Sequence, residues 1–196
     1  MTIRTALAAA VATCAVGGSA NATVVTFDDL PFVGYPNTAA LPTGYGGITW
    51  NSDWAYYSWD QPPYTAGSPP SRVGDVTHIQ SNLPFSFASP KVFQGADFAG
   101  GAGVENSFVM LLGGVVVATS STEVLSATPT FLASGYSGNV DEVMVHTTVV
   151  GHWVMDDVTY TNAVTSAPEP SAWSLMLIGV FGVGARVRAK SRKVVA

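Results

Sequence analysis

The sequence predicts an all-β domain, a β-sandwich closed as a jelly roll, between a signal-peptide helix and a C-terminal hydrophobic helix. Residues 23–165 contain about ten short runs of β-branched and aromatic residues, separated mostly by Gly, Pro, Asn or Ser. No stretch of this region shows a helical period, and so many short strands favour two packed sheets. The expected strands are residues 23–27, 48–50, 76–79, 91–98, 107–112, 115–119, 123–125, 130–133, 140–148 and 152–160.

Two local patterns support this assignment. Gly113 and Gly114 lie between two apolar runs, which is a signal for a two-residue hairpin. In residues 142–146 and 153–156 apolar side chains recur in part at alternate positions, as one buried face of a strand requires. We therefore expect antiparallel strands with one face in the core.

Residues 1–22 have the pattern of a secretory signal peptide. Arg4 precedes an apolar region, and residues 20–22 (Ala-Asn-Ala) form a small-x-small cleavage site. Signal peptidase is therefore an expected partner, and Thr23 would begin the mature chain. The one cysteine, Cys14, falls in the removed segment, so we expect no disulfide in the mature protein.

The chain ends, over residues 166–196, in a short apolar segment and a basic tail. Residues 172–185 are uncharged and would form a helix of about 21 Å, whereas the hydrocarbon core of a bilayer is about 30 Å thick. We expect a short transmembrane helix, because the cations behind it can snorkel to the headgroups. The positive-inside bias places this membrane stop in the cytoplasm and the domain outside. Its cations are Arg186, Arg188, Lys190, Arg192 and Lys193.

Pro168, Glu169 and Pro170 precede this segment, and Trp173 follows them closely. The order of motif, apolar segment and basic tail resembles the PEP-CTERM sorting signal of Gram-negative bacteria. The resemblance implies export, transient anchoring in the inner membrane on the periplasmic side, and processing by an exosortase-type enzyme. The protein would then stay at the cell surface or become extracellular.

Without both ends the chain is strongly acidic. Residues 23–167 keep two cations, Arg72 and Lys91, against twelve acids, a net charge of −10. Such a surface repels nucleic acid phosphates and anionic lipid, so we exclude a nucleic-acid partner. It tolerates neutral polymers and attracts divalent cations.

Two pairs of acids, Asp28 with Asp29 and Asp156 with Asp157, are expected at the end of the first strand and on the last strand. These strands are often neighbours in a jelly roll, and four converging carboxylates would repel one another unless a cation intervened. Ca²⁺ accepts such a set of carboxylate and carbonyl oxygens. Because side chains alternate along a strand, we expect Asp29 and Asp157 to hold a structural Ca²⁺, with Asp28 and Asp156 as the alternates. The alternative is that all four are solvated strand ends or turn caps.

Aromatic side chains crowd into residues 50–64 together with amides and carboxylates. Exposed rings stack on the C–H faces of sugars while polar groups bind hydroxyls, so this mixture suits a neutral saccharide. In a strand, however, Trp54 and Tyr56 share one face while Tyr57 and Trp59 share the other, so both sets cannot line one groove. The alternative is that one set is core and loop residues pack over it. The candidate residues are Trp50, Trp54, Tyr56, Tyr57, Trp59 and Tyr64.

Loose motifs also connect the domain with known modules. Residues 26–30 (Thr-Phe-Asp-Asp-Leu) open it, residues 154–160 (Val-Met-Asp-Asp-Val-Thr-Tyr) close it, and residues 42–50 form a glycine-rich turn. These resemble exported jelly-roll modules that are similar to galactose-binding-like and carbohydrate-binding modules. The resemblance implies the fold, and a structural Ca²⁺ held by an acid on the last strand.

Familiar enzyme motifs are absent from the sequence. It has no Gly-x-Ser-x-Gly elbow or phosphate loop, and His78, His146 and His152 lack the spacing of metal ligands. The leading hypothesis is a non-enzymatic exported protein that binds glycan or is structural in an exopolysaccharide or biofilm matrix. One alternative is a small secreted glycan-active hydrolase. The other is an ice- or surface-adhesion protein, which would need a flat Thr-rich face that Thr147 and Thr148 alone do not supply.

Overall fold

The computed structural model describes residues 21–163, and within them the protein is all-β. The only helix of this part is a 3₁₀ turn, η1 (Tyr45–Gly47). None of the described residues belongs to a helix of the length and hydropathy that a membrane span needs. The expected signal peptide lies almost wholly outside the described residues, and so do the C-terminal hydrophobic helix and its basic tail.

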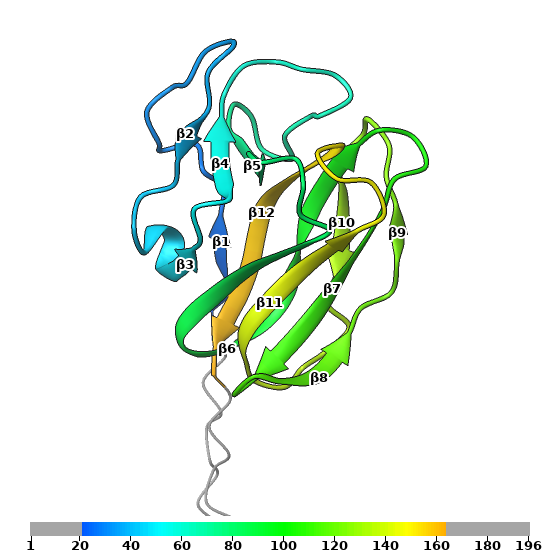
Figure 1. Ribbon diagram of the computed structural model, residues 1–196. Helices are drawn as coiled ribbons and strands as arrows, with labels where there is room; N and C mark the ends of the chain where they lie inside the picture. Colours follow the sequence, from blue (N-terminus) through cyan, green and yellow to red (C-terminus); the bar gives the residue numbers. More distant parts are fainter. Residues whose placement is uncertain (1–20, 164–196) are drawn as a thin grey trace, which may run out of the picture. The chain divides into compact units, whose positions relative to one another are not determined.

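Twelve strands of the described part form one continuous antiparallel sheet (Figure 1). Its main order is β2-β4-β5-β12-β6-β11-β7-β8, while β1 pairs with β12, β3 and β10 pair with β6, and β9 pairs with β7. The strands are β1 (Thr23–Val25), β2 (Ala39–Ala40), β3 (Ile48–Trp50), β4 (Trp54–Tyr57), β5 (Arg72–Asp75), β6 (Asn82–Gly100), β7 (Glu105–Leu112), β8 (Val115–Thr119), β9 (Glu123–Val124), β10 (Thr130–Ala133), β11 (Val140–Thr147) and β12 (Trp153–Asn162).

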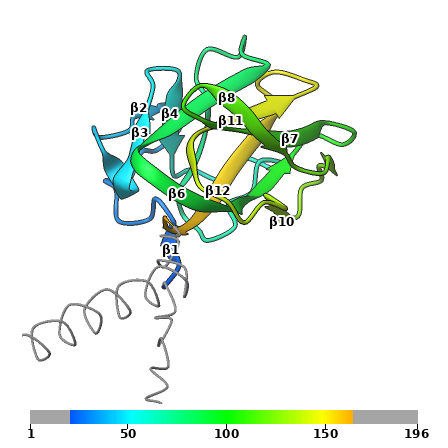
Figure 2. The same cartoon turned by 90° about the horizontal axis from the view of Figure 1, so that it is seen from below.

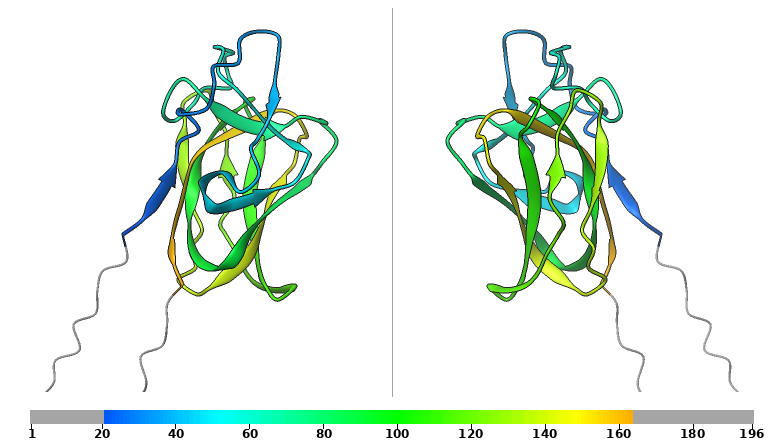
Figure 3. Two further views of the ribbon diagram at one scale, coloured as in Figure 1. Left: turned by 90° about the vertical axis from the view of Figure 1, so that its left-hand side faces the viewer. Right: turned by 90° about the vertical axis from the view of Figure 1, so that its right-hand side faces the viewer.

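Strand β6 joins the two halves of this sheet. Its first part pairs with β3 and β11, whereas its second part pairs mainly with β10 and β12. Ala88, Ser89 and Pro90 between the two parts are exposed. Figure 2 shows β6 curving around the domain, and Figure 3 shows strands on either side of the interior. The folded sheet thus encloses its core in the manner of a β-sandwich.

Aromatic rings dominate the core. Trp54 meets Trp153 with ring centroids 5.7 Å apart and an angle of 81°, and Phe93 meets Phe108 at 4.7 Å and 86°. Edge-to-face pairs of this kind contribute about 0.5–1.5 kcal/mol beyond the area that they bury. The largest rings of this network, each 2% exposed or less, are Trp54, Phe85, Phe93, Phe98, Phe108 and Trp153.

The first and last strands of the described part are neighbours, as the sequence predicted. β1 pairs antiparallel with β12, with Thr23 opposite Tyr160 and Val25 opposite Val158. The Tyr160 hydroxyl also donates a hydrogen bond to the Gly46 carbonyl at 2.7 Å. Both ends of the folded domain therefore leave from the same place, where β1 begins and β12 ends.

The predicted hairpin at Gly113 and Gly114 is present. It joins β7 to β8, and both glycines have positive φ, 59° and 76°. Two positive φ angles are required by a type I′ turn, whose twist matches that of the flanking strands. The expected strands after this hairpin are also present, with ends shifted by two residues at most.

The predicted strand over residues 76–79 is wrong. The chain pairs one segment earlier, in β5, and leaves the sheet at Asp75. The Asp75 carboxylate accepts hydrogen bonds from the backbone N–H groups of Thr77, Ile79 and Gln80 at 2.8–3.0 Å. Because these groups bond to a side chain, they are not available to a neighbouring strand.

Substitution of Gly95 tests the packing of β10 on β6. Gly95 has φ 146°, and an added Cβ would lie 2.2 Å from the Leu132 carbonyl oxygen and 2.8 Å from the Phe131 ring. Because the obstacle is partly backbone, we expect Gly95→Ala to lower the free energy of unfolding by about 3 kcal/mol or more. Urea denaturation of the purified protein measures this loss.

Gly103→Ala is the matched control. Gly103 also has a positive φ, 82°, but an added Cβ would have no atom within 4 Å. We therefore expect Gly103→Ala to lower the free energy of unfolding by only about 1–2 kcal/mol, the cost of a positive φ in a residue that has a Cβ. Equal losses in the two variants would contradict the steric role of Gly95.

Candidate functional site

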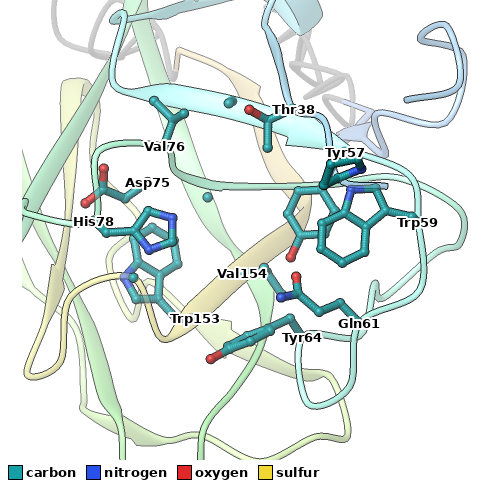
Figure 4. A pocket seen from close by; sticks show the side chains of 14 residues that line it. Thr38, Tyr57, Trp59, Gln61, Tyr64, Asp75, Val76, His78, Trp153 and Val154 are labelled. Carbon is teal, nitrogen blue, oxygen red and sulfur yellow. The ribbon is translucent and has the colours of Figure 1, made fainter. Parts of the chain in front are cut away.

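A pocket of about 260 Å³ lies on the face of the β4-β5-β12 layer that is turned away from the core (Figure 4). The strands supply its floor, which includes Ala55, Tyr57, Gly74 and Val154. The loops that flank these strands supply its walls. The main wall residues are Thr38, Trp59, Gln61, Tyr64, Val76 and His78.

Alternation along β4 separates the core from the pocket. Trp54 and Tyr56 are 1% and 4% exposed and belong to the main core, whereas Ala55 and Tyr57 contribute to the pocket. The Trp54 indole N–H donates to the Pro84 carbonyl at 2.8 Å, so its one polar group is satisfied inside. Because side chains alternate along an extended strand, β4 contributes to the core with one face and to the pocket with the other.

The six aromatic candidates divide in the same way. Tyr57, Trp59 and Tyr64 line the pocket. Trp50 packs against the core with its indole N–H on the Tyr45 carbonyl at 3.0 Å, and Trp54 and Tyr56 are inside. The sequence pattern also missed the contributions of Val76, His78 and Trp153, because these come from segments that only the fold brings together.

The pocket aromatics form a second apolar cluster. Trp59 and Tyr64 pack against Tyr57, Ala99 and Val154 on the outer face of the layer. The ring centroids of Tyr57 and Trp59 are 4.9 Å apart, at an interplanar angle of 37°. Because both rings are held by neighbours, their positions beside the pocket are fixed.

Contacts between segments fix the walls. The Tyr35 ring meets Trp59 edge-on at 4.9 Å, and the Trp59 indole N–H donates to the Asn37 carbonyl at 3.0 Å. On another side, the Tyr64 hydroxyl lies 3.2 Å from His152 Nδ1. These contacts tie the loop after β4 both to the loop before β2 and to the start of β12.

Arg72 supports the aromatic wall from behind. It is 3% exposed, its guanidinium carbon lies 4.5 Å from the Tyr57 ring centroid, and the guanidinium donates to the carbonyls of Trp59 and Pro70. This arrangement is a desolvated cation–π contact. Burial raises the pKa of Tyr57, and the nearby positive charge of Arg72 opposes that rise.

Asp75 shapes the wall that carries Val76 and His78. It is 5% exposed, and besides the three backbone N–H groups it accepts the Thr77 hydroxyl at 2.6 Å. Burial alone would raise the pKa of Asp75, but these hydrogen bonds hold it below its ordinary value. Its carboxylate is therefore charged and already fully engaged by the protein.

A cluster of acids anchors the loop between β4 and β5. The Ser68 backbone N–H donates to Asp156 Oδ2 at 2.9 Å, and the Ser68 hydroxyl donates to Asp157 Oδ1 at 2.7 Å. A Cβ added to Gly67 would lie 2.6 Å from Asp97 Oδ2 and 2.8 Å from Asp157 Oδ2. Asp97 was missed at the sequence level, because it meets Asp156 only through the pairing of β6 with β12.

Burial sets the protonation of this cluster. Asp156 is 2% exposed, and burial, reinforced by the charges of Asp157 and Asp28, raises its pKa to about 8 against the opposing effect of the Ser68 N–H. Burial also raises the pKa of Asp97, and neighbouring Asp157 raises it further. A carboxylic acid is thus kept protonated near neutral pH.

Asp28 and Asp29 lie in the turn after β1, not on the first strand as expected, because β1 already ends at Val25, whereas Asp156 and Asp157 lie on β12. The four acids do not share one common partner. Asp28 accepts the Ser71 N–H at 2.9 Å, and Asp29 accepts the Tyr45 hydroxyl, whereas Asp156 and Asp157 meet Ser68. Among residues 21–163 no group of three or more His, Cys, Asp or Glu side chains is arranged to hold a metal ion. The structural Ca²⁺ stays a prediction of the sequence.

The sorting motif, at Pro168, Glu169, Pro170 and Trp173, and the membrane stop lie outside the described residues. The chain matches no protein-family model, and a search of curated proteins finds no significant match.

Titration of Asp156 predicts how stability depends on pH. Its folded pKa is raised to about 8, so the folded state keeps a proton that the unfolded chain releases near pH 4. The free energy of unfolding should consequently fall as the pH rises from about 4 to about 8. Chemical denaturation across this range measures the slope.

Asp156→Asn removes the titrating group and should flatten that slope. Asp60→Asn, at an exposed position of the loop after β4, is the matched control and should leave the slope as in the parent. An unchanged slope in Asp156→Asn would assign the pH dependence to other groups.

Proposed function

We propose that the protein is an exported, non-enzymatic glycan-binding module, and that its pocket holds the sugar. The pocket arrangement of Tyr57, Trp59 and Tyr64 is the observation that carries the proposal. These rings lie outside the main core, so packing of the β-sandwich does not by itself account for them.

The chemistry of the pocket suits a saccharide. Aromatic faces stack on the C–H side of a sugar ring, and such contacts remove apolar surface from water on both partners. The Gln61 amide and the Thr38 hydroxyl lie in the same pocket and offer both donors and acceptors for sugar hydroxyls (Figure 4). A small number of polar groups among apolar walls is typical of small-molecule sites.

The sequence supplies the cellular setting of the proposal. The signal-peptide pattern and the resemblance to a PEP-CTERM tail support export, transient inner-membrane anchoring and processing by an exosortase-type enzyme. With a net charge of −10 over residues 23–167, the domain favours neutral matrix polysaccharide over polyanions. We also propose that the strands of the β-sandwich are connected as in a jelly roll.

No observation supports either alternative function as well as the pocket supports glycan binding. An adhesion face would need exposed threonines in a plane, yet Thr147 is 2% exposed and its hydroxyl donates to the Val149 carbonyl at 3.2 Å. A glycan-active hydrolase would release reducing ends from the polymer that it binds, so an assay for reducing sugar separates it from a binding module.

Glycan binding is tested by an array of neutral and charged bacterial oligosaccharides, followed by calorimetry on the ligands found. Trp59→Ala and Tyr64→Ala should each weaken binding by about tenfold or more, since truncated aromatic anchors cost the most at binding sites. Phe131→Ala is the control, because Phe131 is an aromatic residue 46% exposed on β10, outside the pocket. Binding that survives both pocket variants would exclude this pocket as the sugar site.

Export is tested independently of binding. Mass spectrometry of the protein isolated from its native host should find a mature chain that begins at or near Thr23 and lacks the basic tail after Ala185. A mature product that retains both Met1 and Lys193 would contradict export and sorting.

A further inference from the structure

We infer that the pocket receives one neutral sugar ring at the end of a glycan chain, rather than a stretch of polysaccharide lying across the domain. This inference rests on the proposed function and specifies its ligand class.

The size of the pocket supports a single ring. Its volume is about 260 Å³, whereas pockets for drug-sized ligands span about 300–1,000 Å³. The small floor residues Ala55 and Gly74 create the depth, because a larger side chain at Ala55 would occupy it. A ring can therefore sink between the aromatic walls instead of resting on a flat platform.

The walls narrow the path that a continuing chain would need. Figure 4 shows the labelled side chains arranged around the opening, with Trp59, Gln61 and Tyr64 on the side opposite His78. A polysaccharide bound through internal rings must enter at one side of its site and leave at the opposite side. Side chains on opposite sides of the pocket obstruct such a path, so we expect the end of a chain to enter more readily than an internal ring.

Three junctions between neighbouring walls are bridged. Trp59 is tied to the loop before β2 by its hydrogen bond to the Asn37 carbonyl, and Tyr64 is tied to His152. The His78 ring lies against Gly151, where an added Cβ would overlap it. These contacts hold the wall loops in place around the pocket.

The charged groups near the pocket are placed so that they do not pair with a charged sugar. The Arg72 guanidinium is 3% exposed and lies 4.5 Å from the Tyr57 ring centroid, so it is shielded from a uronic acid in the pocket. Asp75 in the wall has each carboxylate oxygen engaged by two protein donors, so it has little capacity left for the ammonium group of an amino sugar. A charged sugar would therefore lose hydration without gaining a paired counter-charge, and a neutral ring has the smaller desolvation cost.

The test is calorimetry with neutral oligosaccharides of glucose, galactose, mannose and N-acetylglucosamine, each from one to four rings long. For the sugar that binds, the affinity should reach its plateau at one or two rings. Glucosamine and galacturonic acid should bind about tenfold more weakly or not at all, a difference of about 1.4 kcal/mol. Affinity that grows with every ring up to four, or equal binding of a charged sugar, overturns the inference while leaving glycan binding intact.

Ala55→Leu fills the floor of the pocket and should abolish binding of the single ring, whereas Ala88→Leu, at the exposed bend of β6, should leave it unchanged. Gln61→Ala, in a loop, provides a second variant whose folding does not depend on repacking the floor. It should weaken binding of one ring and of four rings by the same factor, and a larger loss for the longer chain overturns the inference. If no neutral sugar produces heat with the parent protein, the proposed function itself fails.

Discussion

A β-strand has two faces, and the β4-β5-β12 layer must cover both. Trp54, Tyr56 and Trp153 turn inward and join the aromatic core, so the layer is held as part of the folded sheet. The opposite face carries Tyr57 and Val154, which would be exposed apolar surface if nothing lay over them. The loop between β4 and β5 covers part of that face and leaves the rest as the pocket. Core and pocket thus follow from the same alternation of side chains.

The covering loop is held by charged groups at its far end. Ser68 donates hydrogen bonds to Asp156 and Asp157, and the Arg72 guanidinium donates hydrogen bonds to the carbonyls of Trp59 and Pro70. Burying these groups is costly unless each is hydrogen-bonded or neutralised, and the raised pKa of Asp156 reflects that cost. In return, the loop that carries the aromatic wall has a defined position. Asp28, Asp156 and Asp157 therefore hold the loop between β4 and β5, whereas Asp29 bonds to Tyr45 outside it.

Local patterns were enough for much of the fold. The glycine hairpin, the strands that follow it and the pairing of the first strand with the last could all be predicted from residue type and spacing. The long strand β6 was recognised only in its second part, because Pro84 and Pro90 interrupt the pattern of the first. The site was predictable only in part. Strand alternation divided the aromatic residues into two sets, but Asp97, Asp75 and His78 reach their partners through long-range pairing and a side-chain-capped turn that no local pattern encodes.

The antiparallel pairing of β1 with β12 brings the two ends of the folded domain together. Thr23 and Tyr160 face each other in register, so the backbone enters and leaves the domain at one pole. Trp153 begins β12 at the pocket, and the strand then runs ten residues, about 30 Å, to Asn162. Neither end of the folded domain therefore lies at the pocket, and about the length of β12 separates the pocket from both ends.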